Sequence, residues 1–243
     1  MTRLHRLLAA SLLVSMFALP ALGRERRTNF RGTLDGRLNA RMTLVRDGDR
    51  VKGIYLYEAV GEPIRVEGTA NGDDVRLVQY AEGGAKTGQF QGTWRGKTFA
   101  GTWSQPDDPK ARPLNFTFDS GSLPDDGKTG TYTLFNGRNT ETLLVLLLPG
   151  QRILFRLTAF SIPEGDDPSF ANTGVASGSA RIAGDAAVYE AEGCKITLRF
   201  ATRSIRVSQA APGPACGMGQ SVDGSGTYRQ TDNEVDLAAI AGL

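Results

Sequence analysis

Histidine is almost absent from this chain of 243 residues. The single histidine, His5, lies within the first 23 residues, which carry the features of a removable leader described below. Nucleophile activation in Ser-His-Asp and Cys-His arrangements needs an imidazole base, and most catalytic zinc sites need histidine ligands. The rest of the chain offers carboxylates, lysine and tyrosine for catalysis. We therefore expect that the protein is not an enzyme and that it holds no metal and no cofactor.

Cysteine is also scarce, since Cys194 and Cys216 are the only two in the chain. An even count in an exported chain indicates a disulfide rather than free thiols. A loop of about 20 residues closed in this way stabilises a fold by roughly 3 kcal/mol on the chain-entropy argument. We predict a structural Cys194–Cys216 bridge.

The N-terminus has the three parts of a secretory signal peptide. Arg3 and Arg6 make a basic region, residues 7–19 are apolar, and residues 21–23 read Ala-Leu-Gly. The apolar run is too short to cross a bilayer, and no later run is long enough. The pattern predicts cleavage after Gly23, a periplasmic or secreted location in a bacterium, and no transmembrane segment after cleavage.

Cleavage after Gly23 also removes the excess of positive charge. The leader holds two of the 28 basic residues and none of the 26 acidic ones, so 26 of each remain. A chain of zero net charge has no overall field that would attract nucleic acid or anionic lipid. The expected partner is a small molecule or an extracytoplasmic protein, and not nucleic acid.

The pattern of apolar residues predicts an all-β fold. Short alternating runs are separated by Gly, Asp, Asn and Pro, and the 30 glycines are spread along the chain, as in antiparallel meanders. Residues 119–130 have no apolar periodicity and resemble a linker or long surface loop. We expect two small barrel-like or sandwich-like domains: 24–120, a linker at 121–130, then 131–232 with the disulfide, and a tail at 233–243 that holds one weak turn or frays.

The stretch Gly92–Thr98, GTWRGKT, ends like a phosphate-binding loop but predicts a hairpin. A P-loop needs glycine five residues before the Gly-Lys-Thr and a helix after it. Gln91 occupies that position, and FAGTWSQPDD follows. A two-residue turn at Gly96-Lys97 instead pairs Trp94 with Phe99, Gly92 with Gly101 and Phe90 with Trp103, all on one face of the two strands.

This aromatic face has two interpretations. The first is core packing under an antiparallel sheet, because large aromatic residues are mostly buried. The alternative is a ligand floor at the mouth of a small barrel. The candidate ligand-binding residues are Trp94, Trp103, Tyr55, Tyr57 and Tyr80.

Glycine and aromatic residues recur together in the first half of the chain. The segments are Gly53-x-Tyr55, Thr87-Gly88-x-Phe90-x-Gly92 and Gly101-Thr102-Trp103. Their spacing over residues 28–118 resembles the meanders of avidin-type and lipocalin-type proteins, which repeat these residue types where strands cross. The resemblance implies a small β-barrel, and no biotin-site motif accompanies it.

The second half resembles small exported bacterial β-proteins, among them periplasmic lysozyme inhibitors. The residues are Cys194-x-Ile-x-Leu-x-Phe, Cys216-Gly-Met-Gly and Gly226-Thr-Tyr228. One inhibitor family presents a Ser-Gly-x-x-Tyr loop, and the corresponding segment here, residues 225–228, is one residue shorter. The resemblance implies a partner loop that includes Met218, Ser225, Gly226 and Tyr228.

These observations lead to one functional expectation with two alternatives. The first is an exported, non-catalytic binding protein. The second is an inhibitor of a cell-wall hydrolase that acts through the loop at residues 216–228. The third is a glycan hydrolase that uses two carboxylates at a set separation, for which Glu58, Glu62, Glu67 and Glu82 are present but not placed by the sequence.

Overall fold

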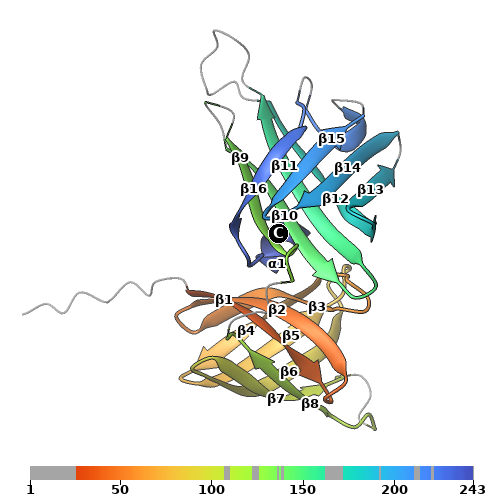
Figure 1. The fold of residues 1–243 in the computed structure, drawn as a ribbon. Helices are drawn as coiled ribbons and strands as arrows, with labels where there is room; N and C mark the ends of the chain where they lie inside the picture. Colours follow the sequence, from red (N-terminus) through yellow and green to blue (C-terminus); the bar gives the residue numbers. More distant parts are fainter. Residues whose placement is uncertain are drawn as a thin grey trace, which may run out of the picture.

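The structure, a computed structural model, consists of two closed antiparallel β-barrels that follow one another along the chain (Figure 1). It describes residues 26–106, 110–121, 126–135, 137, 140–161, 172–191, 193–210, 214–219 and 222–242. The all-β prediction is confirmed, and both units are barrels rather than sandwiches. The predicted cleavage after Gly23 lies outside the described residues. In the described part of the chain, no helix has the length and apolarity that crossing a membrane requires.

The first barrel is an up-and-down meander in which each strand pairs with the next and β1 pairs with β8 to close the ring. Its strands are β1 (Arg26–Leu34), β2 (Leu38–Asp47), β3 (Arg50–Tyr57), β4 (Ile64–Asn71), β5 (Asp74–Tyr80), β6 (Lys86–Arg95), β7 (Thr98–Ser104) and β8 (Leu114–Asp119).

The β6–β7 hairpin has the register that its sequence predicts. Trp94 pairs with Phe99, Gly92 with Gly101, and Phe90 with Trp103, so the Gly-Lys-Thr segment is turn and strand. A Cβ atom on Gly101 would overlap the carbonyl oxygen of Gln91, and one on Gly92 would meet the ring of Phe116 at 2.9 Å. The two glycines therefore let neighbouring backbone and an aromatic ring approach the hairpin closely.

Aromatic rings fill the interior of the first barrel. Phe90 lies at the centre, with its ring 5.2 Å from that of Tyr55 and 5.3 Å from that of Phe116, both edge to face. Edge-to-face pairs at this spacing are favourable beyond the area they bury. The interior is therefore a packed core, and not the hollow that a ligand carrier of the lipocalin type would need.

The second barrel is closed by pairing between its first and last strands, β9 and β16. Its strands are β9 (Gly130–Phe135), β10 (Thr140–Leu148), β11 (Arg152–Ser161), β12 (Asn172–Ala183), β13 (Ala186–Ala191), β14 (Cys194–Ala201), β15 (Ser204–Gln209) and β16 (Gly226–Asp232).

The predicted disulfide is confirmed and holds a loop against this barrel. Cys194 begins β14, and Cys216 ends the 3-10 turn η2 (Pro214–Cys216), 22 residues later. The amide of Val175 on β12 donates to the carbonyl of Gly217, directly after η2. The bridge therefore fixes the segment 214–219 beside β12, on the barrel wall.

The two barrels meet through a third apolar cluster, separate from both interiors. Ile54 and Leu56 project from the outside of β3, and Leu146 and Leu148 from the outside of β10. The even-numbered leucines of β10 serve this junction, whereas Leu143 and Val145 face the barrel interior, which is why the run 143–148 is apolar at every position.

The tail after β16 completes the junction. Helix α1 (Leu237–Ala241) is a single short helix capped by Asp236, whose carboxylate accepts from the amide of Ala238. Leu237 and Ile240 are buried in the junction cluster, and the amide of Leu237 donates to Thr43 Oγ1 on β2. The tail is therefore packed between the barrels rather than frayed (Figure 1).

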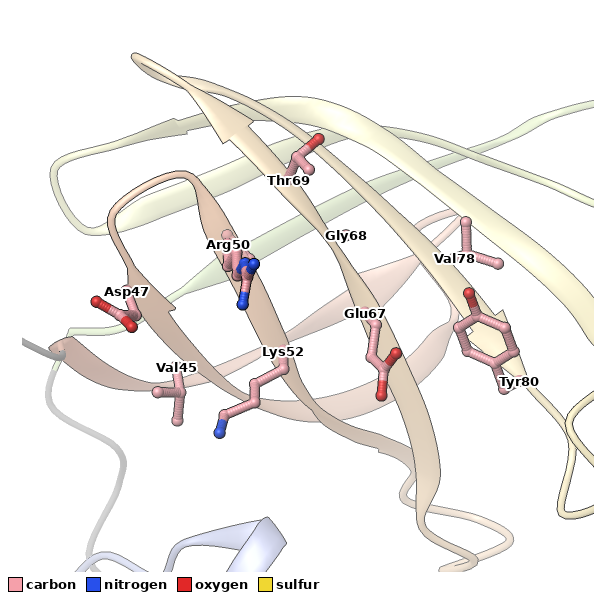
Figure 2. A pocket seen from close by; sticks show the side chains of 10 residues that line it. Val45, Asp47, Arg50, Lys52, Glu67, Gly68, Thr69, Val78 and Tyr80 are labelled. Carbon is pink, nitrogen blue, oxygen red and sulfur yellow. The ribbon is translucent and has the colours of Figure 1, made fainter.

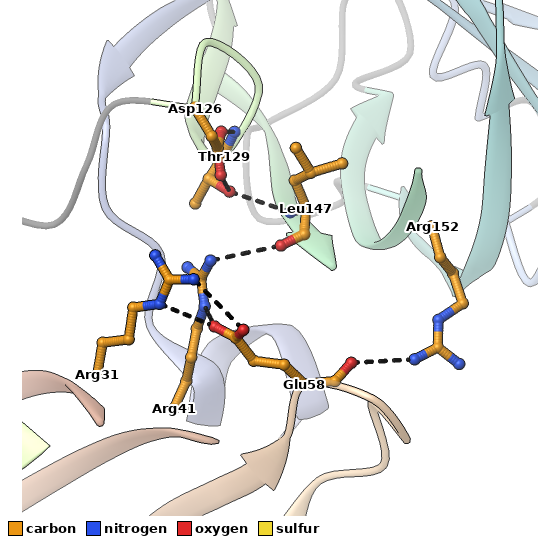
Figure 3. Close-up of polar contacts among 7 residues, drawn as sticks. All are labelled: Arg31, Arg41, Glu58, Asp126, Thr129, Leu147 and Arg152. Atoms are coloured by element: carbon orange, nitrogen blue, oxygen red, sulfur yellow. Dashed lines mark hydrogen bonds and ion pairs between the residues drawn. The ribbon is translucent and has the colours of Figure 1, made fainter. Parts of the chain in front are cut away.

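A buried carboxylate lies beside the same junction (Figure 3). Glu58 is 1% exposed, and its Oε1 accepts from the Nε atoms of Arg31 and Arg41. Arg41 reaches across to the carbonyl of Leu147 in the second barrel, and Arg152 reaches back to the carbonyl of Glu58. Polar bonds in both directions thus connect the barrels around Glu58.

Candidate functional site

Three of the predicted ligand-binding aromatics gather at one end of the first barrel. The ring of Tyr57 lies 5.4 Å from that of Tyr55. Gln79 Oε1 accepts from the Tyr55 hydroxyl at 2.6 Å and from Trp103 Nε1 at 3.1 Å. Burial, followed by the proximity of Tyr57, raises the pKa of Tyr55 above its ordinary value. The polar atoms of Tyr55 and Trp103 are thus both bonded to Gln79, within the barrel.

The other two predicted aromatics lie elsewhere. Trp94 is buried beside the β6–β7 turn, where its ring packs 5.2 Å from that of Phe30. Tyr80 lies on the outer wall, with the guanidinium of Arg65 4.7 Å from its ring centre. The structure therefore separates the five residues into three places and does not assemble them into one ligand floor.

The residues of the predicted partner loop serve the inside of the second barrel. Met218 is 3% exposed and Tyr228 is fully buried, both within the core cluster. Ser225 Oγ accepts from the amide of Gln209, and Gly226 begins β16. In this structure Met218 and Tyr228 face the barrel core and do not lie on the surface that a partner would meet.

Tyr228 belongs to a buried polar group. Its hydroxyl lies 2.6 Å from Glu141 Oε2 and 3.0 Å from the carbonyl of Gly224. Burial, and next the hydrogen bond with Glu141, raise the pKa of Tyr228 above its ordinary value. A phenol held neutral in this way is a hydrogen-bond donor inside a core rather than a base.

A large hollow lies on the outer wall of the first barrel (Figure 2). It crosses β2 to β5 and encloses about 740 Å³. We call it the outer-wall groove; its lining residues are Val45, Asp47, Arg50, Val51, Lys52, Glu67, Gly68, Thr69, Val78 and Tyr80.

The register of the four strands positions the side chains of the groove. Val45 pairs with Lys52, Lys52 with Glu67, and Glu67 with Val78, so these residues form one row across the sheet. Side chains alternate along a strand, and Val66 and Leu77 at the alternate positions face the core. The row thus faces outwards, as Figure 2 shows for Lys52 and Glu67 on neighbouring strands.

The ion pairs of the groove leave two cations without an acidic partner. Glu67 Oε1 bonds Arg65 Nη1 at 2.7 Å, and this same guanidinium lies over Tyr80. Among the residues that the structure describes, no ion pair joins Arg50 or Lys52 to a carboxylate. The groove therefore offers the cationic groups of Arg50 and Lys52 beside an aromatic ring and three valines, and its carboxylates are Asp47 and the Arg65-bound Glu67. The arrangement suits a ligand that carries an anionic group and an apolar part.

A smaller hollow of about 250 Å³ continues the groove towards the tail. It shares Val45, Lys52 and Glu67 with the groove, and Ala238 of α1 lies at its other side. Arg27 also lines it and bonds Asp236 at 2.8 Å. The extended shape suits an elongated ligand, one end of which would lie beside the junction of the barrels.

Within the described ranges, no three His, Cys, Asp or Glu residues lie close enough together to hold a metal ion. The two buried glutamates, Glu58 and Glu141, belong to different barrels and bond to arginines and to a tyrosine respectively.

Comparisons with protein-family models, with curated proteins and with solved structures found no match to this chain. The candidate site therefore stands on its geometry.

Sequence reasoning overlooked the groove because its residues look like an ordinary solvated strand face. Lys52, Glu67 and Thr69 alternate with core residues, which is the pattern of any antiparallel sheet with one face in water. The row of outward residues forms only when four successive strands pair in one register. The loop between β3 and β4, residues 58–63, separates Lys52 from Glu67, and no local sequence signal gives the register across it.

Proposed function

We propose that this protein is an exported, non-catalytic binding protein whose ligand lies in the outer-wall groove. The observation that carries the proposal is the groove itself: it presents Arg50 and Lys52 without carboxylate partners, whereas aromatic and aliphatic side chains fill both barrel interiors. Concave surfaces with a few converging polar groups are the usual places where proteins bind ligands. The ligand class is an elongated molecule that bears an anionic group.

The placement of the acidic side chains also supports binding over catalysis. A glycosidase needs two carboxyl groups on opposite sides of one bond. Glu58 is held by two arginines at the junction, and Glu67 of the groove is held by Arg65. Turnover of a glycan that is abolished by changing a single carboxylate would overturn the non-catalytic proposal.

The inhibitor alternative receives less support from the structure. It places the contact on a loop at residues 216–228, and Met218 and Tyr228 of that segment are buried. We therefore place the ligand on the first barrel rather than on this part of the second.

The test is calorimetric titration of residues 24–243 with two oligosaccharides of equal length, oligogalacturonate and maltotetraose. We expect the anionic probe to bind and the neutral probe not to bind. Lys52→Glu and Arg50→Glu should each weaken binding at least tenfold. Lys97→Glu makes the same charge change at the exposed β6–β7 turn of the same barrel and should leave binding within twofold.

Two results would contradict the proposal. Equal binding of both probes would show that the cations take no part. Equal weakening by Lys97→Glu would show that only the overall charge of the barrel matters.

A further inference from the structure

One seam of the second barrel is only partly closed. β12 pairs with β11 over ten residue pairs, from Arg152↔Arg181 to Ser161↔Asn172. On its other side, β12 pairs with β13 only at Ile182↔Ala187 and Ala183↔Ala186, next to the turn. Among the residues that the structure describes, the β12–β13 ladder ends there, and the two strands continue without further pairing.

The hydrogen bonds of the neighbouring ladders show which backbone groups face this seam. Ile182 donates to the carbonyl of Gln151, so the even-numbered residues of β12 point their peptide groups at β11. In an antiparallel ladder the alternate residues point the other way. The N–H and C=O groups of Ser177, Ser179 and Arg181 therefore face the seam.

The same argument applies to β13. Phe200 donates to the carbonyl of Asp185, so the odd-numbered residues of β13 serve β14. The peptide groups of Val188 and Glu190 therefore face the seam from its opposite side. Together with β12, they present N–H and C=O groups at the repeat of a β-strand, a pattern that another extended backbone matches.

The chain itself already uses this edge of β12 at one end. The amide of Val175 donates to the carbonyl of Gly217 at 3.2 Å, from the segment that the Cys194–Cys216 bridge holds in place. A non-strand segment thus extends the hydrogen bonding of β12 up to the point where the seam begins. Beyond it, the edge of β12 has the same geometry, and within the described residues no strand pairs with it until Ile182.

The inner side of the seam is closed by an aromatic ring. The Tyr189 ring lies against Gly178, where a Cβ atom would collide with it, and packs edge to face on Phe155 at 5.3 Å. The hydrophobic core is therefore complete without β12–β13 pairing. The outer side of the seam is open: Ser177, Ser179 and Arg181 are exposed, and Val188 is 44% exposed.

The outer faces of β11 and β12 carry three arginines, of which Arg181 lies on the strand that borders the seam. Arg152 and Arg181 are directly opposite one another, and Arg156 pairs with Ser177. Like charges placed opposite each other across a ladder are unfavourable. The guanidinium of Arg152 bonds the carbonyls of Glu58 and Ala59 in the first barrel. Arg181 is exposed at the seam, and within the described ranges no ion pair joins it to a carboxylate, so an acidic group brought by a partner is complementary to Arg181.

We propose that the seam is a docking site for an extended, acidic peptide segment of a partner protein, which adds as a strand to β12. Its backbone bonds the peptide groups of Ser177, Ser179 and Arg181. An acidic side chain pairs with Arg181, and an apolar side chain contacts Val188. This surface lies on the second barrel and is independent of the outer-wall groove.

The experiment measures binding of a fluorescein-labelled peptide with four Asp-Val repeats to residues 24–243 by anisotropy. We expect saturable binding and at least tenfold slower exchange of the Ser177, Ser179 and Arg181 amides when the peptide is bound. A peptide with four Lys-Val repeats should bind at least tenfold more weakly. Equal binding of the two peptides would overturn the acidic part of the proposal.

A matched pair of variants tests the backbone contact. Ser179→Pro removes the seam-facing N–H without removing a bond to β11, and should weaken binding at least tenfold. Ser179→Ala keeps the N–H and should bind within twofold of the unchanged chain. Thermal unfolding of both variants checks that the barrel is intact.

The peptide itself offers a test that leaves the protein unchanged. Two modified peptides are made, one methylated at the backbone nitrogens of its Asp residues and one at those of its Val residues. Each modification removes the N–H donors along one edge of the extended peptide. One modification should abolish binding and the other should not. The proposal is overturned if neither modification weakens binding, or if the unmodified peptide fails to bind at millimolar concentration.

Discussion

Arg31 Nε and Arg41 Nε bond the same oxygen of Glu58, Oε1, at 3.0 and 2.9 Å. The two arginines come from neighbouring strands, where they are directly paired. One carboxylate therefore holds together two guanidinium groups that would otherwise repel each other, at the place where Arg41 reaches the second barrel.

Replacing Glu58 with glutamine is expected to destabilise the protein by about 3 kcal/mol, because it leaves two guanidinium groups at the junction without their counter-charge. Urea unfolding measures the change. Glu67→Gln is the control: it breaks an ion pair whose two side chains are nearly half exposed, and such pairs contribute less than about 1 kcal/mol. Equal effects of the two changes would show that the Glu58 group is no more than a surface pair.

Truncation of Leu237 to alanine should cost about 2–3 kcal/mol in the free energy of unfolding, since it opens a cavity in the junction cluster. Leu38→Ala makes the same chemical change at an exposed position of β2, and should cost less than about 0.5 kcal/mol. Denaturant titration of both variants gives the comparison. A small effect of Leu237→Ala would mean that the tail adds little to the union of the barrels.

Loss of the Cys194–Cys216 bridge should cost about 3 kcal/mol, because the bridge closes a loop with a sequence separation of 22. The double variant Cys194→Ser, Cys216→Ser is suitable. Its local effect should be faster hydrogen exchange of the Val175 amide, which bonds the carbonyl next to η2. Hydrogen exchange of the Phe90 amide, in the other barrel, should accelerate by no more than the loss of global stability explains. Uniform acceleration across both barrels would contradict this local role.

Two of the buried tyrosines, Tyr55 and Tyr228, predict a loss of stability at high pH. Burial raises the pKa of Tyr55 and of Tyr228 above the ordinary value of 10.0. A raised pKa in the folded state contributes stability that is fully present below the unfolded value and is lost as the pH rises beyond it.

The measurement is the free energy of unfolding between pH 9 and pH 12, where each such tyrosine adds a slope of about 1.4 kcal/mol per pH unit above pH 10. Tyr55→Phe should reduce that slope by the contribution of one tyrosine, about 1.4 kcal/mol per pH unit. This change leaves Gln79 Oε1 with its bond from Trp103, so the barrel end is retained. An unchanged slope would contradict the assignment.

Local sequence signals were sufficient where structure depends on near neighbours. Gly96 fixed the hairpin register through its two-residue turn, and alternation placed Ile196 and Leu198 inside the second barrel. The only two cysteines predicted their own bridge. In the hairpin and in the alternating strand a few adjacent residues determine the geometry, and for the bridge two cysteines leave a single possible pairing.

The junction and the groove were beyond this reasoning because they depend on segments far apart in the chain. Periodicity could not show that Leu146 and Leu148 serve a second cluster rather than the core of their own barrel. Leu237 and Ile240 gave only a weak helical signal, since packing and not propensity makes α1 stable. Trp94 and Trp103 share a face of one hairpin, yet strand length keeps their rings apart, with Trp94 beside the turn and Trp103 opposite Phe90.

The position of α1 between the barrels has a consequence for the order in which the chain folds. β8 completes the first barrel at Asp119, but β16, which closes the second, ends at Asp232, and the tail that covers Ile54 and Leu56 is made after both. A first barrel that folds before the rest of the chain, as N-terminal domains generally do, exposes Ile54 and Leu56 until the tail, roughly 110 residues later, packs against them.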